Sequence, residues 1–321
     1  MKELLVLTII LIMPLAMAAN LEVQKIDKGS VVIAEIKNPA VFDFIITNNG
    51  AKDNFEIYSL VGVSFSPKGT FPLDTGQKKM EVKAYLNDLL EKNRGFVNFE
   101  YQIKGQNSGI FKDTLTVKIV ELKDTFTISG DNIRVDDLNS IISIRNVQNT
   151  NLEDVNVKFK SVFFEHEEKI SLAPFEEDNI TIKIDKEKTK NLAAGSYVVI
   201  AEVEVEGKKE KFENVINYLE EENVVSEEKK SGFIVRHSTI TKTNEGNVPV
   251  EVEIKINKNI ITRLISSYSQ EPHNIARNGL IIENAWTKKI SPGESFSIKS
   301  TTNYTFPFIL MILVVIIVLF A

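Results

Sequence analysis

The residue types that carry catalysis and metal binding are few in this sequence, and their spacing matches no catalytic motif. The chain has no cysteine and three histidines, His166, His237 and His273. It contains no H-x-x-x-H pair, no G-x-S-x-G elbow, no Walker loop and no G-x-G-x-x-G segment. The absence of cysteine also excludes thiol catalysis, thiolate zinc sites and iron–sulfur clusters. The sequence therefore argues against most classes of enzyme, and we expect no cofactor.

Acidic residues form one candidate metal site. Asp131, Asp136 and Asp137 crowd a short stretch with Asn132, and such oxygen ligands hold calcium. The spacing differs from that of an EF-hand loop, and Asp and Asn are also common turn residues. A calcium site between domains and a simple turn both remain open. His166, flanked by glutamates, is a weaker candidate for a cation contact, and the simpler interpretation is a solvated loop between two strands.

Five other residues suggest modification or contact. Asn179 and Asn303 begin N-x-[ST] sequons, which are candidate glycosylation sites in an exported chain. The only tryptophan, Trp286, is expected in the core of a strand sandwich rather than on a binding face. The pair Phe163-Phe164 is expected to place one ring on each face of a strand, and an exposed ring would be a candidate contact.

Strands must position these side chains, because apolar residues recur with a period of two. One buried and one solvated face per strand is typical of antiparallel sheets. Asn, Gly and Pro separate the strands, as in sandwiches, and only 85–92 and 260–269 favour short helices. We therefore predict an all-β fold of tandem antiparallel β-sandwiches. The clearest alternating segments are 96–104, 113–120, 155–159, 180–184 and 250–254.

The strands repeat along the chain in three units. In each unit a strand ends at an asparagine, the chain turns, and a second strand follows. These asparagines are Asn48, Asn146 and Asn244. Asparagine suits the position because it tolerates left-handed backbone and hydrogen-bonds its own turn. Later in each unit an apolar residue, a tight turn and another strand follow, at 73–82, 172–182 and 290–298.

The repeated segments resemble the immunoglobulin-like domains of archaeal cell-surface proteins, of the type called CARDB-like. The resemblance is clearest at 48–50 (N-N-G), at 290–294 (I-S-P-G-E) and at 194–197 (A-G-S-Y), and it covers 21–302 in pieces. The second unit departs from the pattern because no glycine follows its asparagine, and the third carries an extra stretch at 258–283. The resemblance implies immunoglobulin-like sandwiches with a structural or adhesive surface role and no catalytic residues.

The two ends of the chain indicate export and membrane attachment. Residues 1–18 combine a charged start, a short apolar run and an A-x-A pattern, as in a signal peptide, although a retained anchor is the alternative. Residues 306–321 are apolar and uncharged, which favours a transmembrane segment at 304–321. Other interpretations are part of a longer membrane region, a lipid-anchor signal, or a buried core element.

These features together divide the chain and bound its function. We expect sandwiches at 19–122, 123–219 and 233–303, with a charged linker at 220–232. The net charge of −6 disfavours nucleic acid. The expected function is a single-pass, membrane-anchored extracellular protein for adhesion or envelope architecture, non-catalytic, with membrane lipid and a protein or glycan as partners. The alternatives are an accessory subunit of a membrane complex or, more weakly, a carbohydrate-binding or hydrolytic ectodomain.

Overall fold

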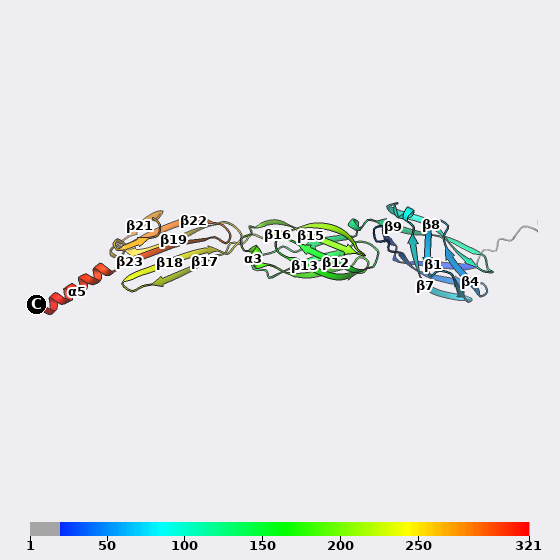
Figure 1. Cartoon of the computed structure of the whole chain (residues 1–321), viewed down its shortest axis with the longest axis horizontal. Helices are drawn as coiled ribbons and strands as arrows, with labels where there is room; N and C mark the ends of the chain where they lie inside the picture. The colour runs from blue at the N-terminus through cyan, green and yellow to red at the C-terminus, as the bar shows by residue number, and fades with distance from the viewer. Residues whose placement is uncertain (1–19, 321) are drawn as a thin grey trace, which may run out of the picture.

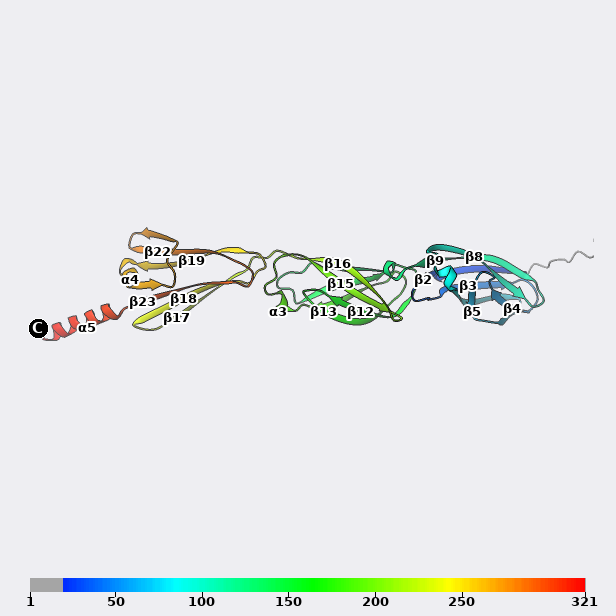
Figure 2. The ribbon, with the colours of Figure 1, turned by 45° about the horizontal axis from the view of Figure 1, so that its top comes forward.

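The computed structural model describes residues 20–320, and strands dominate it. Six sheets form three face-to-face pairs, which follow one another along the molecule as a rod (Figure 1). The rod stays extended when turned by 45° (Figure 2). The predicted all-β fold class is confirmed, whereas the signal peptide predicted at residues 1–18 lies outside the described residues.

The first unit, 21–120, pairs the sheet β1-β3-β7-β5 with the sheet β2-β9-β8-β4-β6. All its ladders are antiparallel except β2 with β9. Its strands are β1 (Leu21–Gly29), β2 (Val31–Ile33), β3 (Ala40–Asn48), β4 (Asp53–Tyr58), β5 (Val63–Ser66), β6 (Thr70–Leu73), β7 (Gly76–Leu86), β8 (Gly95–Gly105) and β9 (Ile110–Val120), with the helical turn α2 (Asp88–Glu91).

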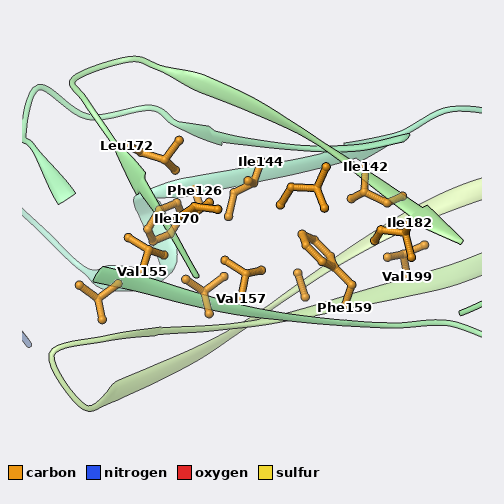
Figure 3. Packing of buried hydrophobic residues seen from close by; sticks show 14 of the residues in the cluster. Phe126, Ile142, Ile144, Val155, Val157, Phe159, Ile170, Leu172, Ile182 and Val199 are labelled. Atoms are coloured by element: carbon orange, nitrogen blue, oxygen red, sulfur yellow. The ribbon is translucent and has the colours of Figure 1, made fainter. Parts of the chain in front are cut away.

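The second unit, 126–218, follows the 3-10 turn η1 (Leu122–Asp124) and pairs β10-β11-β14 with β13-β12-β15-β16. Alternate residues of facing strands, such as Ile144 and Phe159, are fully buried between the sheets (Figure 3). Its elements are β10 (Phe126–Gly130), β11 (Asn139–Asn146), β12 (Leu152–Lys160), β13 (Glu165–Leu172), β14 (Glu177–Lys183), α3 (Lys186–Thr189), β15 (Gly195–Val205) and β16 (Lys208–Tyr218).

The third unit, 224–303, pairs β17-β18-β23-β20 with β19-β22-β21. The charged linker predicted at 220–232 is wrong over most of its length, because β17 pairs with β18 along eight residues. Its elements are β17 (Val224–Ser231), β18 (Val235–Asn244), β19 (Val250–Asn259), α4 (Ile260–Leu264), β20 (Ser266–Tyr268), β21 (Asn274–Asn278), β22 (Ile281–Ile290) and β23 (Ser295–Asn303).

The three units share an antiparallel triplet of strands and one facing strand pair. The triplets are β1-β3-β7, β10-β11-β14 and β17-β18-β23. The equivalent pairs are β4/β6, β12/β13 and β19/β22, and the second strand of each pair leads into the third strand of its triplet. Within residues 20–320, the first two units continue with a further hairpin, β8-β9 and β15-β16. The internal repeat predicted from the sequence is therefore present in the fold. The repeat places its asparagines at matching positions, since Asn48, Asn146 and Asn244 end β3, β11 and β18.

A helix, α5 (Thr305–Phe320), leaves the third unit at the end opposite the first unit (Figure 1). It is apolar along its whole length, and its side chains contact no other element enough to be buried. Among residues 20–320, no helix combines the length and apolar character needed to cross a membrane.

Candidate functional site

The three repeat asparagines form equivalent hydrogen bonds within their turns. Asn48, Asn146 and Asn244 are at most 2% exposed and stand at equal intervals along the chain. Each Oδ1 accepts from the main-chain N–H two residues on. Each Nδ2 donates to a carbonyl of its own turn and to one in the turn before β7, β14 or β23. We call the turns 48–51, 146–150 and 244–248 the asparagine corners.

The corner of the second unit packs against the first unit. The main-chain N–H of Val31 donates to the carbonyl of Asn149 at 3.3 Å, and Asn38 Nδ2 donates to Thr150 Oγ1 at 2.9 Å. Val31 and Ile33 are buried in the same apolar cluster as the core of the second unit. An apolar core shared across a junction resists bending. The first two units therefore form one stiff body.

The corner of the third unit is held by hydrogen bonds to the segment that follows β16 and, through Ala194, to the second unit. Asn247, 1% exposed, donates from Nδ2 to the Leu219 carbonyl at 2.6 Å and accepts at Oδ1 from the Glu221 N–H at 2.7 Å. Its own carbonyl accepts from the N–H of Ala194 at 2.9 Å. A Cβ on Gly246 would lie 2.3 Å from the Glu221 carbonyl oxygen, so only glycine fits there.

The corner of the first unit lies at the end of the rod farthest from α5, and neither later unit covers it (Figure 1). Beside it, the Asp53 carboxylate accepts from both main-chain N–H groups of Asn107 and Ser108, at 2.8 and 2.9 Å, and from the Ser108 hydroxyl at 2.6 Å. The Ser108 hydrogen bond is the main cause that lowers the pKa of Asp53 to about 2. The tip, 48–54 with 105–109, is thus a rigid and largely exposed surface.

The opposite end of the rod exposes apolar side chains. Leu264 in α4 is 82% exposed, Phe233 in the β17–β18 turn 79%, and Leu280 in the β21–β22 turn 73%. α4 and both turns lie at the end where α5 begins (Figure 2). Along α5, Phe306 is 72% exposed and Phe320 is 87% exposed. Exposed apolar surface on this scale marks a contact with a partner or a membrane.

Hydrogen bonds fix the root of α5 to the third unit. The main-chain N–H of Tyr304 donates to the Ile234 carbonyl at 2.9 Å, and that of Asn303 donates to the Ile265 carbonyl at 2.9 Å. The Arg236 guanidinium lies 5.3 Å from the centre of the Tyr304 ring. α5 therefore starts from a defined position beside the exposed apolar turns.

The predicted metal residues are not assembled as a site. The Asp137 carboxylate accepts from the Arg134 N–H at 2.7 Å and so closes a turn, while Asp131 and Asp136 are exposed. Among residues 20–320, no group of three or more His, Asp or Glu side chains can hold a metal ion. The turn interpretation accounts for this cluster. His166 contacts Glu168 at 3.2 Å and lies in β13 rather than in a loop.

The other predicted residues divide into exposed and buried positions. Asn179 and Asn303 are exposed, in β14 and at the end of β23, and Asn179 Oδ1 accepts from Ser143. Trp286 is fully buried, as predicted, and its Nε1 donates to the Gln270 carbonyl at 3.1 Å. The prediction for Phe163-Phe164 is wrong: the pair lies in the turn between β12 and β13, and both rings turn into the core.

Two features escaped sequence reasoning. The packing of Asn149 and Asn247 against the preceding unit depends on neighbours that are distant in sequence. The sequence feature that accompanies it is the equal spacing of Asn48, Asn146 and Asn244. A polar pocket at the α5 end of the third unit was also missed. Its signal is the change from apolar to polar residues at alternate positions, at Ile256 to Lys258 and at Ile298 to Ser300.

No family model and no curated protein matches this chain. Similarity to solved structures is weak, as three of them illustrate. A protein of unknown function from Porphyromonas gingivalis W83 is 14% identical, over 62% of this chain and 99% of that one, with a TM-score of 0.24. The Escherichia coli chaperone DraB is 10% identical over 62% of this chain and 97% of that one, with a TM-score of 0.23. Escherichia coli alpha-2-macroglobulin activated by porcine elastase is 10% identical over 89% of this chain and 30% of that one, with a TM-score of 0.25. Similarity at this level carries no conclusion about function.

Proposed function

We propose that this chain is a membrane-anchored, non-catalytic stalk that carries its first unit away from the cell. The observation that carries this proposal is the coincidence, at one end of the rod, of α5 with the exposed apolar side chains of Phe233, Leu264 and Leu280. α5 has sixteen residues, so it is about 24 Å long and enters most of a hydrocarbon core of about 30 Å. The apolar turns then seat at the interface around it.

The rest of the rod supports a presenting role. Each later unit is held to the one before it by its asparagine corner, through Asn149 at the first junction and Asn247 at the second. Stiff junctions keep a tip far from its anchor, whereas flexible linkers let it fold back. The free tip is then the surface that meets a protein or glycan partner outside the cell.

The finer assignment follows the sequence resemblance. In this proposal the units are CARDB-like domains of an archaeal surface protein, exported by a signal peptide at residues 1–18. Asn179 and Asn303 are exposed, as glycosylation requires, and both lie on the same side of the membrane as the stalk. Mass spectrometry of the native glycopeptides tests these two sites, and unmodified asparagine at both removes this part of the proposal.

Membrane fractionation tests the anchor. The full chain is expected to remain in the membrane pellet after alkaline carbonate washing. Two lysines in α5, Val314→Lys with Ile316→Lys, cost about 2.5–3.5 kcal/mol each in a bilayer and are expected to release the chain. The matched control is Val225→Lys on the exposed edge strand β17, which keeps the chain in the pellet. A wild-type chain in the soluble fraction, or a double variant retained like the wild type, refutes the anchor.

A further inference from the structure

The interior of the third unit is apolar over one half and polar over the other. Inward-facing residues of β23 change from Ile298 to Ser300, and those of β19 change from Ile256 to Lys258. The apolar cluster of this unit stops at that level. Beyond it, at the end where α5 begins, lies a pocket of about 400 Å³ that is lined by Lys258, Ser300 and residues of β17 and β18.

The pocket carries more positive than negative charge. Lys230, Arg236 and Lys258 line it, and the nearest carboxylate is that of Glu228, which contacts Lys230 at 2.9 Å. Within residues 20–320, neither Arg236 nor Lys258 forms an ion pair, and Lys258 Nζ donates only to Thr302 Oγ1, at 3.2 Å. Burial is the main cause that lowers the pKa of Lys258; the Glu228 carboxylate opposes this shift, and the positive charge of Lys230 adds to it. A bound anion would stabilise the charged form of this lysine.

A buried hydroxyl group points to the same ligand. Ser300 lines the pocket and is 1% exposed, and its Oγ has no hydrogen-bond partner among the described residues. Buried polar groups are normally paired, because a lost hydrogen bond to water is unfavourable. Opposite it on β18, Ser238 donates to Glu228 at 2.8 Å and forms no hydrogen bond with the Ser300 hydroxyl. A ligand oxygen in the pocket would accept from the Ser300 hydroxyl.

We propose that this pocket binds a phosphate group. Cationic side chains from separate strands and a free hydroxyl donor suit an oxyanion with several acceptor oxygens. Arg236 also contacts Tyr304 at the root of α5, so the pocket opens beside the proposed anchor. The source of the phosphate is either the headgroup of an anionic lipid or free phosphate. The lipid source rests on the proposed membrane anchor, whereas phosphate binding itself does not.

Titration calorimetry on the full chain in neutral detergent tests this inference. The probes are inorganic phosphate and dihexanoylphosphatidylglycerol, with acetate at equal ionic strength as the control anion. Lys258→Met and Ser300→Ala are each expected to weaken binding about tenfold or more, as for a lost charge-assisted hydrogen bond. The matched control is Lys299→Gln, on the outward face of the same strand, which leaves affinity unchanged. Tighter binding of the lipid than of phosphate identifies a headgroup, and equal affinity identifies free phosphate as sufficient.

Two results overturn the proposal: heats for phosphate and lipid no larger than those for acetate, or wild-type affinity in Lys258→Met. Ser300→Ala separates ligand binding from folding, because loss of an unpartnered hydroxyl leaves thermal stability in phosphate-free buffer equal or higher. Carbonate washing of the same variants keeps this test apart from the anchor. Lys258→Met is expected to stay in the membrane pellet, so failure of phosphate binding and failure of the anchor give different results.

Discussion

Removal of the corner asparagine of the third unit, Asn244, tests whether its side chain holds that unit together, and tryptophan fluorescence can report the result. Asn244 is fully buried, and its side chain satisfies three main-chain groups: the carbonyls of Val248 and Ile290, at 2.8 and 3.2 Å, and the N–H of Gly246, at 3.0 Å. Asn244→Ala removes the side-chain donor of both carbonyls, whereas the Gly246 N–H keeps the Asn223 carbonyl as an acceptor at 3.1 Å. At about 1 kcal/mol for each of the two carbonyls, we expect the third unit to lose about 2 kcal/mol of unfolding free energy.

Trp286 makes the measurement specific to one unit. It is the only tryptophan and is fully buried in the third unit, so its fluorescence reports the unfolding of that unit. With a urea dependence of about 1–2 kcal/mol per molar, the midpoint of the Asn244→Ala variant is expected about 1–2 M below the wild type. The equivalent change in the second unit, Asn146→Ala, and the exposed change Asn257→Ala should each leave the unfolding free energy of the third unit within about 0.5 kcal/mol of the wild type. An Asn244→Ala shift no larger than that of Asn257→Ala refutes the reasoning.

Three further predictions concern the junction, the tip and the proposed orientation. Gly246→Ala places a Cβ 2.3 Å from a backbone oxygen and is expected to lower the urea midpoint reported by Trp286. Gly50→Ala is the control, because its Cβ would meet no atom nearer than 3.4 Å and should be tolerated. Equal effects of the two changes on urea unfolding would contradict the packing of the third unit's corner. The pKa of Asp53 is lowered from 3.8 to about 2, so the stability that its carboxylate gives the fold is complete above pH 4 and is lost as the pH falls towards 2. The thermal unfolding temperature of Asp53→Asn should therefore depend less on pH in that window than that of the wild type. Parallel plots of unfolding temperature against pH would contradict this. The chain has no cysteine, so Leu264→Cys and Ala51→Cys can each be labelled at one site with a polarity-sensitive dye. Added liposomes should shift the emission of the dye to the blue at position 264 and leave it unchanged at position 51. Equal emission spectra at the two positions would contradict the proposed orientation.

The strands and their repeat were predictable because they depend on local pattern. Alternation in 155–159 places Val155, Val157 and Phe159 in the core, and the structure buries all three. The asparagine that ends each repeated strand was likewise visible, because its side chain bonds within its own turn. The burial of Trp286 followed from its strand context.

Errors arose where tertiary context decides. Phe163-Phe164 looked like strand, but the chain turns there and both rings enter the core. The segment 224–231 looked like a linker because its side chains are mostly charged. It is an edge strand, held by backbone pairing to β18 and solvated on much of its surface. The pocket around Lys258 and Ser300 joins strands that are distant in sequence, so no local pattern unites its residues.

Protease treatment of intact cells that express the full chain tests the central proposal most directly. The account predicts that external protease removes the three β units and that mass spectrometry of the membrane fraction finds a remnant containing α5, 305–320. The same treatment of lysed cells serves as the control for protease access. A body that stays protected on intact cells, or a full-length chain that is recovered without membrane, would contradict a stalk held outside the cell by its C-terminal helix.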